Sequence, residues 1–259
     1  MASGEVTTDV VHHLQGDDSV VLEMEHLQKS FGNNHVLRDI TLRIKKGENL
    51  VVLGQSGTGK SVLIKCIVGL IEIDDGRLCI LGQDVATLGE KELLALRKKI
   101  GFLFQSSALY DSMTVRDNLE FPLRRQGHPL DRHEMESLVG EALKNVGLSD
   151  AIELMPSELS GGMRKRIGLA RTLILKPEIM LYDEPTTGLD PITSREISNL
   201  IMEVQKTYNT SSIIITHDIE CARRTSNRVV VMKDGMCAAE GSFDELEKSP
   251  DAWVRSFFE

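Results

Sequence analysis

The sequence predicts an α/β fold with a mostly parallel sheet, an antiparallel β part and an inserted α-helical subdomain. Three short segments, Leu50–Leu53, Ile179–Tyr182 and Ile213–Thr216, are almost entirely hydrophobic, as strands buried on both faces of a parallel sheet are. Helical periodicity separates such strands, for example over Pro191–Tyr208. A stretch from about 106 to 176 has helical spacing only, which predicts a helical insertion in the α/β core.

Further strands complete the predicted sheet. Val20–Leu27 and Val36–Ile44 are predicted as strands joined by a turn at Gly32-Asn33-Asn34. A strand over Ile100–Phe104 precedes the helical stretch, and a closing pair of strands is predicted around Arg228–Glu240.

The inserted stretch is predicted to hold three helices. They are Thr114–Arg125, Asp131–Val146 and Ser160–Leu175, and the breakers between them include Gly127, Pro129, Gly147 and Pro156. We expect one domain over 20–259, with the helical subdomain at about 106–176. Residues 1–19 have acidic residues and no basic-then-apolar order, so they predict a flexible extension rather than a signal peptide.

The composition excludes several classes of protein. A net charge of −9 over 259 residues argues against broad nucleic-acid binding, although Arg164-Lys165-Arg166 allows a local basic patch. The longest apolar stretch, Val62–Ile71, is interrupted by Lys65 and is far shorter than the ~20 residues that span a bilayer. The four dispersed cysteines predict ordinary buried thiols in a reducing compartment, and the adjacent His12 and His13 lack further nearby metal ligands.

A glycine-rich motif follows the first short hydrophobic strand. It consists of Gly54, Gln55, Ser56, Gly57, Thr58, Gly59, Lys60 and Ser61. The glycines let backbone N–H groups wrap phosphates, and the N-terminus of the following helix adds its positive end. We expect Lys60 to reach the β- and γ-phosphates and the Ser61 hydroxyl to bind Mg²⁺. The core is therefore predicted to be that of a P-loop NTPase.

Two carboxylates end the hydrophobic strand Ile179–Tyr182. Ligand sites of open α/β sheets lie beyond the carboxyl ends of strands, where Asp183 and Glu184 follow. We expect Asp183 to hold Mg²⁺ through water, and Glu184 to orient and deprotonate the attacking water.

A third motif begins the last helix of the insertion. Ser160 is predicted to cap that helix, and Gly161 and Gly162 have no side chains to obstruct a phosphate. By itself this pattern is also that of a plain helix cap. With the P-loop and the Asp-Glu pair, however, Leu159-Ser-Gly-Gly-Met163 resembles the signature of ABC-type ATPases. The resemblance covers about Val20–Glu259 and implies that these groups contact the γ-phosphate of ATP bound to a second copy.

Four further positions match that family. Gln105 resembles the Q-loop glutamine, which implies contacts with Mg²⁺, with the attacking water and with a transmembrane partner. Thr187-Gly188-Leu189-Asp190 resembles the D-loop that bridges the dimer, and His217 resembles the switch histidine that holds the γ-phosphate. Phe31 occupies the place of an aromatic that stacks on adenine, and an ordinary core phenylalanine is the other interpretation.

Within the family the chain is most similar to the ATPases of MCE-associated (Mla-type) lipid transporters. The resemblance rests on Lys60-Ser61-Val62-Leu63, on Met163 followed by Arg164-Lys-Arg166, and on the segments Leu109–Asn118, Phe121–Arg124, Asp190–Thr193 and Val254–Phe258. It implies a subunit on the cytoplasmic face of the inner membrane that is held by integral-membrane permease subunits, with an MCE-domain protein as a further partner and ATP and Mg²⁺ as cofactors.

Two alternatives differ in function. An ATPase of a small-solute (amino-acid-type) importer shares the same cassette. Soluble ABC ATPases of DNA repair or translation usually carry two cassettes, a long coiled coil or zinc-binding cysteines, and this chain has none of these features. The cargo, its direction of transport, and whether Phe257 and Phe258 clasp a partner ATPase or pack on their own core stay open at this point.

Overall fold

The computed structural model of the protein describes residues 20–126 and 130–258. The expected N-terminal extension (1–19, with His12 and His13) and the predicted breakers Gly127 and Pro129 lie outside these ranges. In the part that is described, ten strands form one mixed sheet in the order β5-β4-β1-β2-β10-β9-β3-β8-β7-β6. The strands are β1 (Val20–Phe31), β2 (Asn34–Lys45), β3 (Asn49–Gly54), β4 (Asp75–Ile80), β5 (Gln83–Asp84), β6 (Ile100–Leu103), β7 (Ile179–Asp183), β8 (Ser211–Ile215), β9 (Arg228–Lys233) and β10 (Met236–Gly241).

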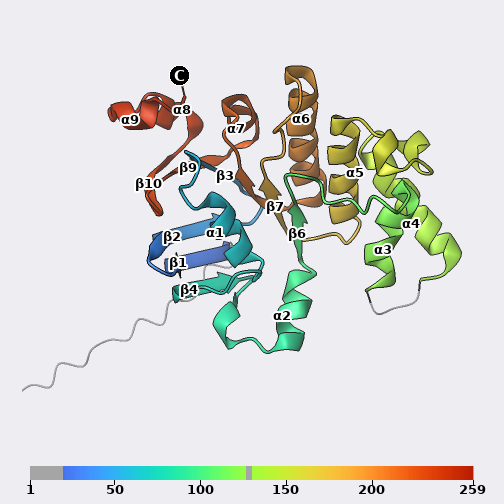
Figure 1. Cartoon of the computed structure of the whole chain (residues 1–259), viewed down its shortest axis with the longest axis horizontal. Coiled ribbons are helices and arrows are strands. Elements are labelled where there is room, and N and C mark those ends of the chain that lie inside the picture. Colours follow the sequence, from blue (N-terminus) through green and yellow to red (C-terminus); the bar gives the residue numbers. More distant parts are fainter. Residues whose placement is uncertain (1–19, 127–129, 259) are drawn as a thin grey trace, which may run out of the picture.

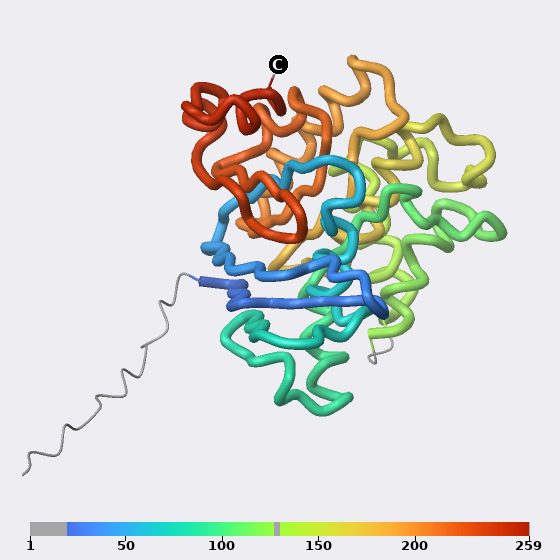
Figure 2. Tube along the Cα trace, turned by 60° about the vertical axis from the view of Figure 1, so that its left-hand side comes forward, coloured from blue at the N-terminus to red at the C-terminus, as the bar shows by residue number. Residues whose placement is uncertain are grey.

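The sheet has a parallel half and an antiparallel half. β9, β3, β8, β7 and β6 are parallel neighbours. β1 pairs antiparallel with β2 and with β4, and β10 joins the two halves by pairing with β2 and β9. Figure 2 shows β1 and β2 side by side, coloured blue. The predicted fold class, a mostly parallel α/β core with an antiparallel β part, is therefore confirmed.

Helices cover both faces of the parallel half. They are α1 (Lys60–Ile67), α2 (Glu90–Arg97), α3 (Val115–Arg124), α4 (Arg132–Asn145), α5 (Gly161–Leu173), α6 (Pro191–Tyr208), α7 (Ile219–Thr225), α8 (Phe243–Glu247) and α9 (Ala252–Arg255). Alternate residues of β3 enter different cores: Val51 and Leu53 join the core of the helices α3–α6, whereas Leu50 and Val52 join that of α1 and β1. Burial on both faces explains why this strand is hydrophobic throughout.

The predicted helical insertion consists of α3, α4 and α5, which gather on the side of the molecule away from β1, β2 and β4 (Figure 1). Each of these helices starts at a side-chain cap: Thr114, Asp131 and Ser160 accept hydrogen bonds from backbone N–H groups three residues on. The first residues of the predicted helical stretch are not helical, since Ser107 and Ala108 have φ angles of 62° and 47°.

The elements β4, β5 and α2 were not predicted from the sequence. In β4 only Leu78 and Ile80 are buried, and in α2 only Leu96 is. Elements that bury so few side chains carry little hydrophobic periodicity, and periodicity is the main signal in a single sequence. Across residues 20–126 and 130–258, no helix combines the length and the apolarity needed to cross a membrane.

A buried asparagine fixes the loop between β6 and α3. Asn118 is fully buried, its carbonyl accepts from the Tyr110 N–H at 2.8 Å, and its amide donates to the carbonyls of Tyr110, Met113 and Thr114 at 3.0–3.1 Å. The Asn118 side chain thus supplies hydrogen-bond partners to backbone groups that have none within a regular strand or helix.

Replacing Asn118 by Ala should therefore lower the free energy of unfolding by about 3 kcal/mol, because buried backbone groups lose their partners. Asn145→Ala, which removes a hydrogen bond to Tyr208 at an exposed position, should cost about 1 kcal/mol or less. Urea unfolding of both variants measures the difference; equal losses would contradict this role for Asn118.

Candidate active site

The candidate site lies where four parallel strands end. Val52 of β3 and Asp183 of β7 are both register partners of Ile215 in β8. Because neighbouring parallel strands end at the same edge, the loops that follow them meet there. These loops carry the P-loop after β3, Gln105 after β6, Glu184 after β7 and His217 after β8.

An open cleft of about 810 Å³ brings most of the predicted residues together. It is lined by Gly54, Gln55, Ser56, Gly57, Gly59, Lys60 and Ser61 of the P-loop and by Gln105, Glu184 and His217. Thr58 faces inward instead, since its hydroxyl donates to the Gln55 carbonyl at 2.9 Å. A nucleotide-sized cleft with converging polar groups is the usual form of a ligand site.

Glycine is required at two turns of the P-loop. Gly57 and Gly59 have φ angles of 84° and 98°, in the left-handed region that other residues avoid. A Cβ atom on Gly59 would also lie 2.9 Å from the Val36 carbonyl oxygen and 2.8 Å from a methyl group of Leu37. Gly59 is the N-cap of α1, so the loop delivers the positive end of this helix to the cleft.

Lys60 is held inside the loop. Its ammonium group donates to the carbonyls of Gly54 at 2.7 Å and Gln55 at 3.0 Å. Burial lowers its pKa below the ordinary value, and the negative charges of Glu184 and Asp183 oppose that shift. Lys60 is thus a largely buried cation that borders the cleft.

Asp183 carries an unsatisfied carboxylate. Its Oδ1 atom is buried without a hydrogen-bond partner. Burial raises the pKa of Asp183, the charge of Glu184 raises it further, and Lys65, Lys165 and Lys60 oppose the rise. Among the described residues no group of three or more His, Cys, Asp or Glu side chains could hold a metal by itself. Asp183 is not among the residues that line the cleft, whereas Ser61 is. The buried Oδ1 of Asp183 and the hydroxyl of Ser61 are oxygen ligands of the kind that Mg²⁺ takes, and Mg²⁺ completes its shell with water and phosphate.

Glu184 and His217 form a pair. Glu184 Oε2 lies 2.8 Å from His217 Nδ1 and accepts from the Thr187 hydroxyl at 3.0 Å. The Glu184 side chain is 15% exposed and that of His217 is 67% exposed, so the carboxylate is sheltered and the ring faces the cleft. The Glu184 backbone adopts a left-handed conformation with φ of 50°. A strained residue of this kind marks a functional turn when its surroundings hold it in place.

The remaining predicted residues do not line this cleft. Ser160 caps α5 by accepting from the Met163 N–H at 3.2 Å and is exposed, whereas Gly162 is buried against Thr193. Asp190 caps α6 through the N–H groups of Ile192 and Thr193. Phe31 ends β1 and is 49% exposed, with Lys29 Nζ 5.5 Å from the centroid of its ring.

Sequence reasoning missed three residues near the site. Ser256 and Phe257, from the C-terminal segment, line the cleft, and Lys165 donates to backbone carbonyls of the loops that carry Gln105 and Glu184. The three cations at 164–166, where the composition allowed a local basic patch, are not exposed together, since Lys165 is only 5% exposed and Arg166 pairs with Glu196. Only the three-dimensional path of α5 distinguishes this lysine from its neighbours.

The C-terminal aromatics pack on their own chain. Phe258 is buried edge-on against Phe243 of α8, with ring centroids 5.0 Å apart. Phe257 stacks edge-on against Trp253. The segment lies beside α7 in Figure 1 and forms a wall of the cleft.

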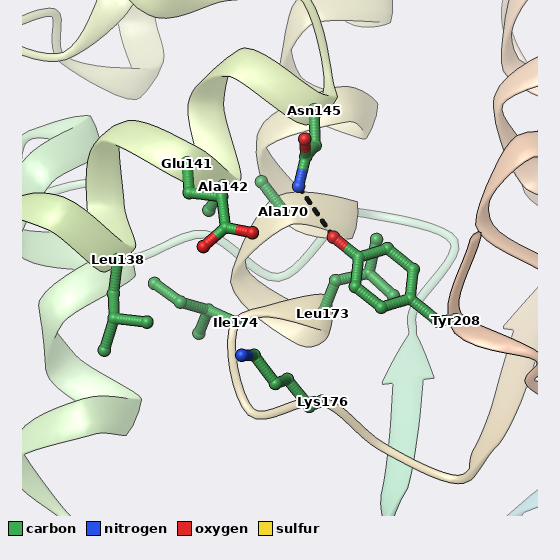
Figure 3. Close-up of a pocket in the computed structure, with 9 residues that line it drawn as sticks. All are labelled: Leu138, Glu141, Ala142, Asn145, Ala170, Leu173, Ile174, Lys176 and Tyr208. Carbon is green, nitrogen blue, oxygen red and sulfur yellow. Dashed lines mark hydrogen bonds between the residues drawn. The ribbon is translucent and has the colours of Figure 1, made fainter.

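A separate small cavity lies between α4, α5 and the C-terminus of α6 (Figure 3). Two of the residues that line this cavity are hydrogen-bonded, since Asn145 donates to the Tyr208 hydroxyl at 2.6 Å. The cavity volume of about 20 Å³ is room for one water molecule, so it is a packing defect rather than a ligand site.

Comparison with known proteins gives a family match over residues 37–187, to the family described as ABC transporter. The probable ribonucleotide transport ATP-binding protein mkl of Mycobacterium leprae is 40% identical over 92% of this chain and 68% of its own length. The intermembrane phospholipid transport system ATP-binding protein MlaF of Haemophilus influenzae is 37% identical over 92% and 89%. The methionine import ATP-binding protein MetN of Rhizobium johnstonii is 37% identical over 90% and 64%. The chain thus spans about two thirds of mkl and MetN.

Solved structures are also similar. CbiO1 from Clostridium perfringens, part of the transporter complex cbiONQ, has a TM-score of 0.82 and 31% identity over 89% of this chain and 92% of its own. The dimeric ATP-binding cassette MJ0796, bound to ADP and Pi in a post-hydrolysis state, has a TM-score of 0.78 and 30% identity over 86% and 98%.

The raised pKa of Asp183 predicts a stability cost in the nucleotide-free protein. A carboxyl whose pKa is higher in the folded state loses stability as pH rises from its unfolded pKa to its folded one. Asp183→Asn should therefore raise the free energy of unfolding at pH 7 by up to about 1 kcal/mol, and by less at pH 4. Urea unfolding at both pH values tests this, with the exposed Asp111→Asn as the matched control; a destabilised Asp183→Asn protein at pH 7 would contradict it.

Proposed function

The chain belongs to the ABC transporter family as an ATP-hydrolysing subunit that uses ATP and Mg²⁺, and from this premise we propose that it energises phospholipid transport of the MCE/Mla type. The observation that carries the roles of the site residues is the Glu184–His217 pair, whose side chains are 2.8 Å apart and line the same cleft as the P-loop.

The residue roles follow from the geometry of the cleft. The P-loop amides and Lys60 hold the phosphates, and the N-terminus of α1 adds to this positive field. Glu184 acts as general base toward a water molecule, since its carboxylate is sheltered and faces the cleft. His217 holds the γ-phosphate while its Nδ1 orients that carboxylate, and Gln105 positions the same water from the opposite loop.

Asp183, Ser61 and Gln105 would hold the magnesium ion. When bound, Mg²⁺ neutralises charge on the β- and γ-phosphate oxygens. The orphaned Oδ1 of Asp183 supports this assignment, because a buried acceptor without a donor is costly unless a cation or its water shell satisfies it.

Two copies form the working unit. Ser160, Gly161 and Gly162 lie at the N-terminus of α5 and do not line the cleft of their own chain. A helix N-terminus with an exposed hydroxyl is an anion site, and a second chain is the source of a phosphate that could reach it. The dimeric cassette with bound ADP and Pi supports this arrangement. In the proposed pair, Thr187–Asp190 would bridge the two copies of this chain.

The cargo is a phospholipid in this proposal. The match to MlaF extends over 89% of that protein, whereas the matches to mkl and MetN extend over 68% and 64%. The motif pattern Met163 to Arg166, with the segment after Gln105, favours the same branch. Import of an amino-acid-type solute is the alternative, supported by the equal identity to MetN.

The membrane partner would dock at a groove beside β6. This groove of about 450 Å³ is lined by Phe102, Phe104, Tyr110 and Phe121 and by Arg171. It is adjacent to the Gln105 loop, so a permease helix seated there would sense the nucleotide site. We propose that permease subunits hold the protein on the cytoplasmic face of the inner membrane, with an MCE-domain protein in the same complex.

Phe31 is proposed to stack on adenine. Replacing Phe31 by Ala should raise the KM for ATP about tenfold, because stacking on an aromatic ring contributes about 1–3 kcal/mol. Phe31→Trp should retain tight binding, and kcat should change little in either variant. Titration with a fluorescent ATP analogue measures affinity directly. An alanine variant with unchanged affinity would leave Phe31 as an ordinary β1 residue.

Glu184→Gln should bind Mg-ATP but hydrolyse it at least about a hundredfold more slowly, since the base is lost and the shape is kept. Tagged Glu184→Gln protein, purified from mildly solubilised membranes with Mg-ATP, should therefore retain its partners. We expect mass spectrometry to find a permease, an MCE-domain protein and phospholipid. Lys60→Ala, which lacks the phosphate-binding cation, is the matched control and should recover fewer of them.

Other outcomes of this purification contradict parts of the proposal. A permease recovered with a periplasmic solute-binding protein would replace lipid by a small solute. A dimer with no membrane partner would overturn the transport function, and a monomer throughout would overturn the paired site.

A further inference from the structure

A buried lysine links α5 to the two loops that hold the proposed catalytic groups. Lys165 is 5% exposed, and its Nζ donates to the carbonyl of Gln105 at 2.5 Å and to the carbonyl of Glu184 at 3.1 Å. These loops follow different strands, β6 and β7, and Lys165 comes from a third element, α5. One ammonium group therefore fixes the distance between both loops and the helix.

The Glu184 backbone is held from two sides. Its N–H donates to the Ile215 carbonyl of β8 at 2.9 Å, and its carbonyl accepts from Lys165. With φ of 50°, the residue adopts a left-handed conformation that residues other than glycine disfavour unless their surroundings support it. The direction of the carboxylate depends on this backbone, so the two hydrogen bonds orient the side chain that faces the cleft.

The loop after Gln105 is fastened to the same helix at two further points. Gly168 lies against Ser107, because a Cβ atom at Gly168 would come within 3.0 Å of the Ser107 Cβ. Arg171 donates to the Ser107 carbonyl at 3.2 Å and to the Asn118 side chain at 3.4 Å. Lys165, Gly168 and Arg171 are spaced by three residues, so they lie on one side of α5.

A buried ammonium group is costly unless hydrogen bonds and nearby charges compensate it. Burial lowers the pKa of Lys165, and the charges of Asp183 and Glu184 oppose that change. A hydrophobic side chain of similar length would avoid the desolvation cost and fill the same space. The ammonium group is thus poorly explained by packing and well explained by the two carbonyls that it joins.

We propose that Lys165 is a positioning residue for ATP hydrolysis, which acts by fixing the backbones of Gln105 and Glu184 to α5. Ser160 caps the N-terminus of α5. The helix whose N-terminus is proposed to contact the nucleotide of a second copy therefore also orients Glu184 toward the nucleotide of its own chain. This inference rests on the roles proposed above for Gln105, Glu184 and the paired site.

Lys165→Met tests the inference, because methionine has similar length and no donor. In the purified full-length protein with Mg-ATP, kcat should fall about tenfold or more, as expected when reacting groups are misplaced. The KM for ATP should change less than about twofold, since the P-loop contacts remain. Lys165→Arg, which keeps donors and charge, should recover most of the lost kcat. Lys176→Met, the same change at an exposed position just after α5, should behave as wild type.

A loss of kcat could also come from unfolding. Thermal unfolding therefore measures the folded fraction of the Lys165→Met and Lys165→Arg proteins, and their kcat values are compared at equal folded fraction. Wild-type kcat in Lys165→Met, a change confined to KM, or equal kcat losses in two folded variants would each overturn the inference. Glu184→Gln is assayed alongside. If Glu184→Gln keeps wild-type kcat, the proposed role of Glu184 fails; if it is inactive while Lys165→Met is unaffected, only the inference fails.

Discussion

The parallel register of β3, β8 and β7 is the constraint on which the rest of the site depends. Val52 and Asp183 both pair with Ile215, so β7 and β8 end at one level and β3 continues only to Gly54. The phosphate loop, the carboxylates and the histidine then need only one or two further residues to reach a common cleft. A shift of one strand by one residue in this register would turn each of its side chains to the opposite face of the sheet, where they would no longer fit the neighbouring helices. Burial of both faces of these strands prevents such a shift.

Charges gather at this edge at some cost to stability. Lys60, Lys165 and Asp183 are each partly or fully buried. Burial disfavours their charged forms: it lowers the pKa of both lysines and raises the pKa of Asp183. The two lysines find carbonyl partners, whereas one oxygen of Asp183 finds none. A site that is incompletely satisfied in the free protein retains binding capacity for a cation and phosphates. The strand ends supply the rigidity that keeps these groups from relaxing onto each other.

The parallel core and the P-loop could be predicted from the sequence because their signals are local. Continuous hydrophobic strands and the fixed spacing from Gly54 to Ser61 need no knowledge of distant contacts. The segment Asp75–Arg97 could not be predicted in this way, because its strands and helix bury few side chains. The cleft walls contributed by Ser256 and Phe257 depend on how α8 and α9 fold back, which no local pattern encodes.

Lys165 shows why a motif alone underestimates a site. In the sequence it stands between Arg164 and Arg166 as one of three cations, and helical spacing assigns them to different sides of α5. Arg164 turns to the Leu159 carbonyl, Arg166 turns to Glu196, and only Lys165 points into the core between β6 and β7. A helix that begins at an anion-binding N-terminus and holds the neighbouring loops by a buried cation cannot tilt without disturbing both. In a paired ATPase, such a helix would make the geometry of one nucleotide site depend on contact with the other.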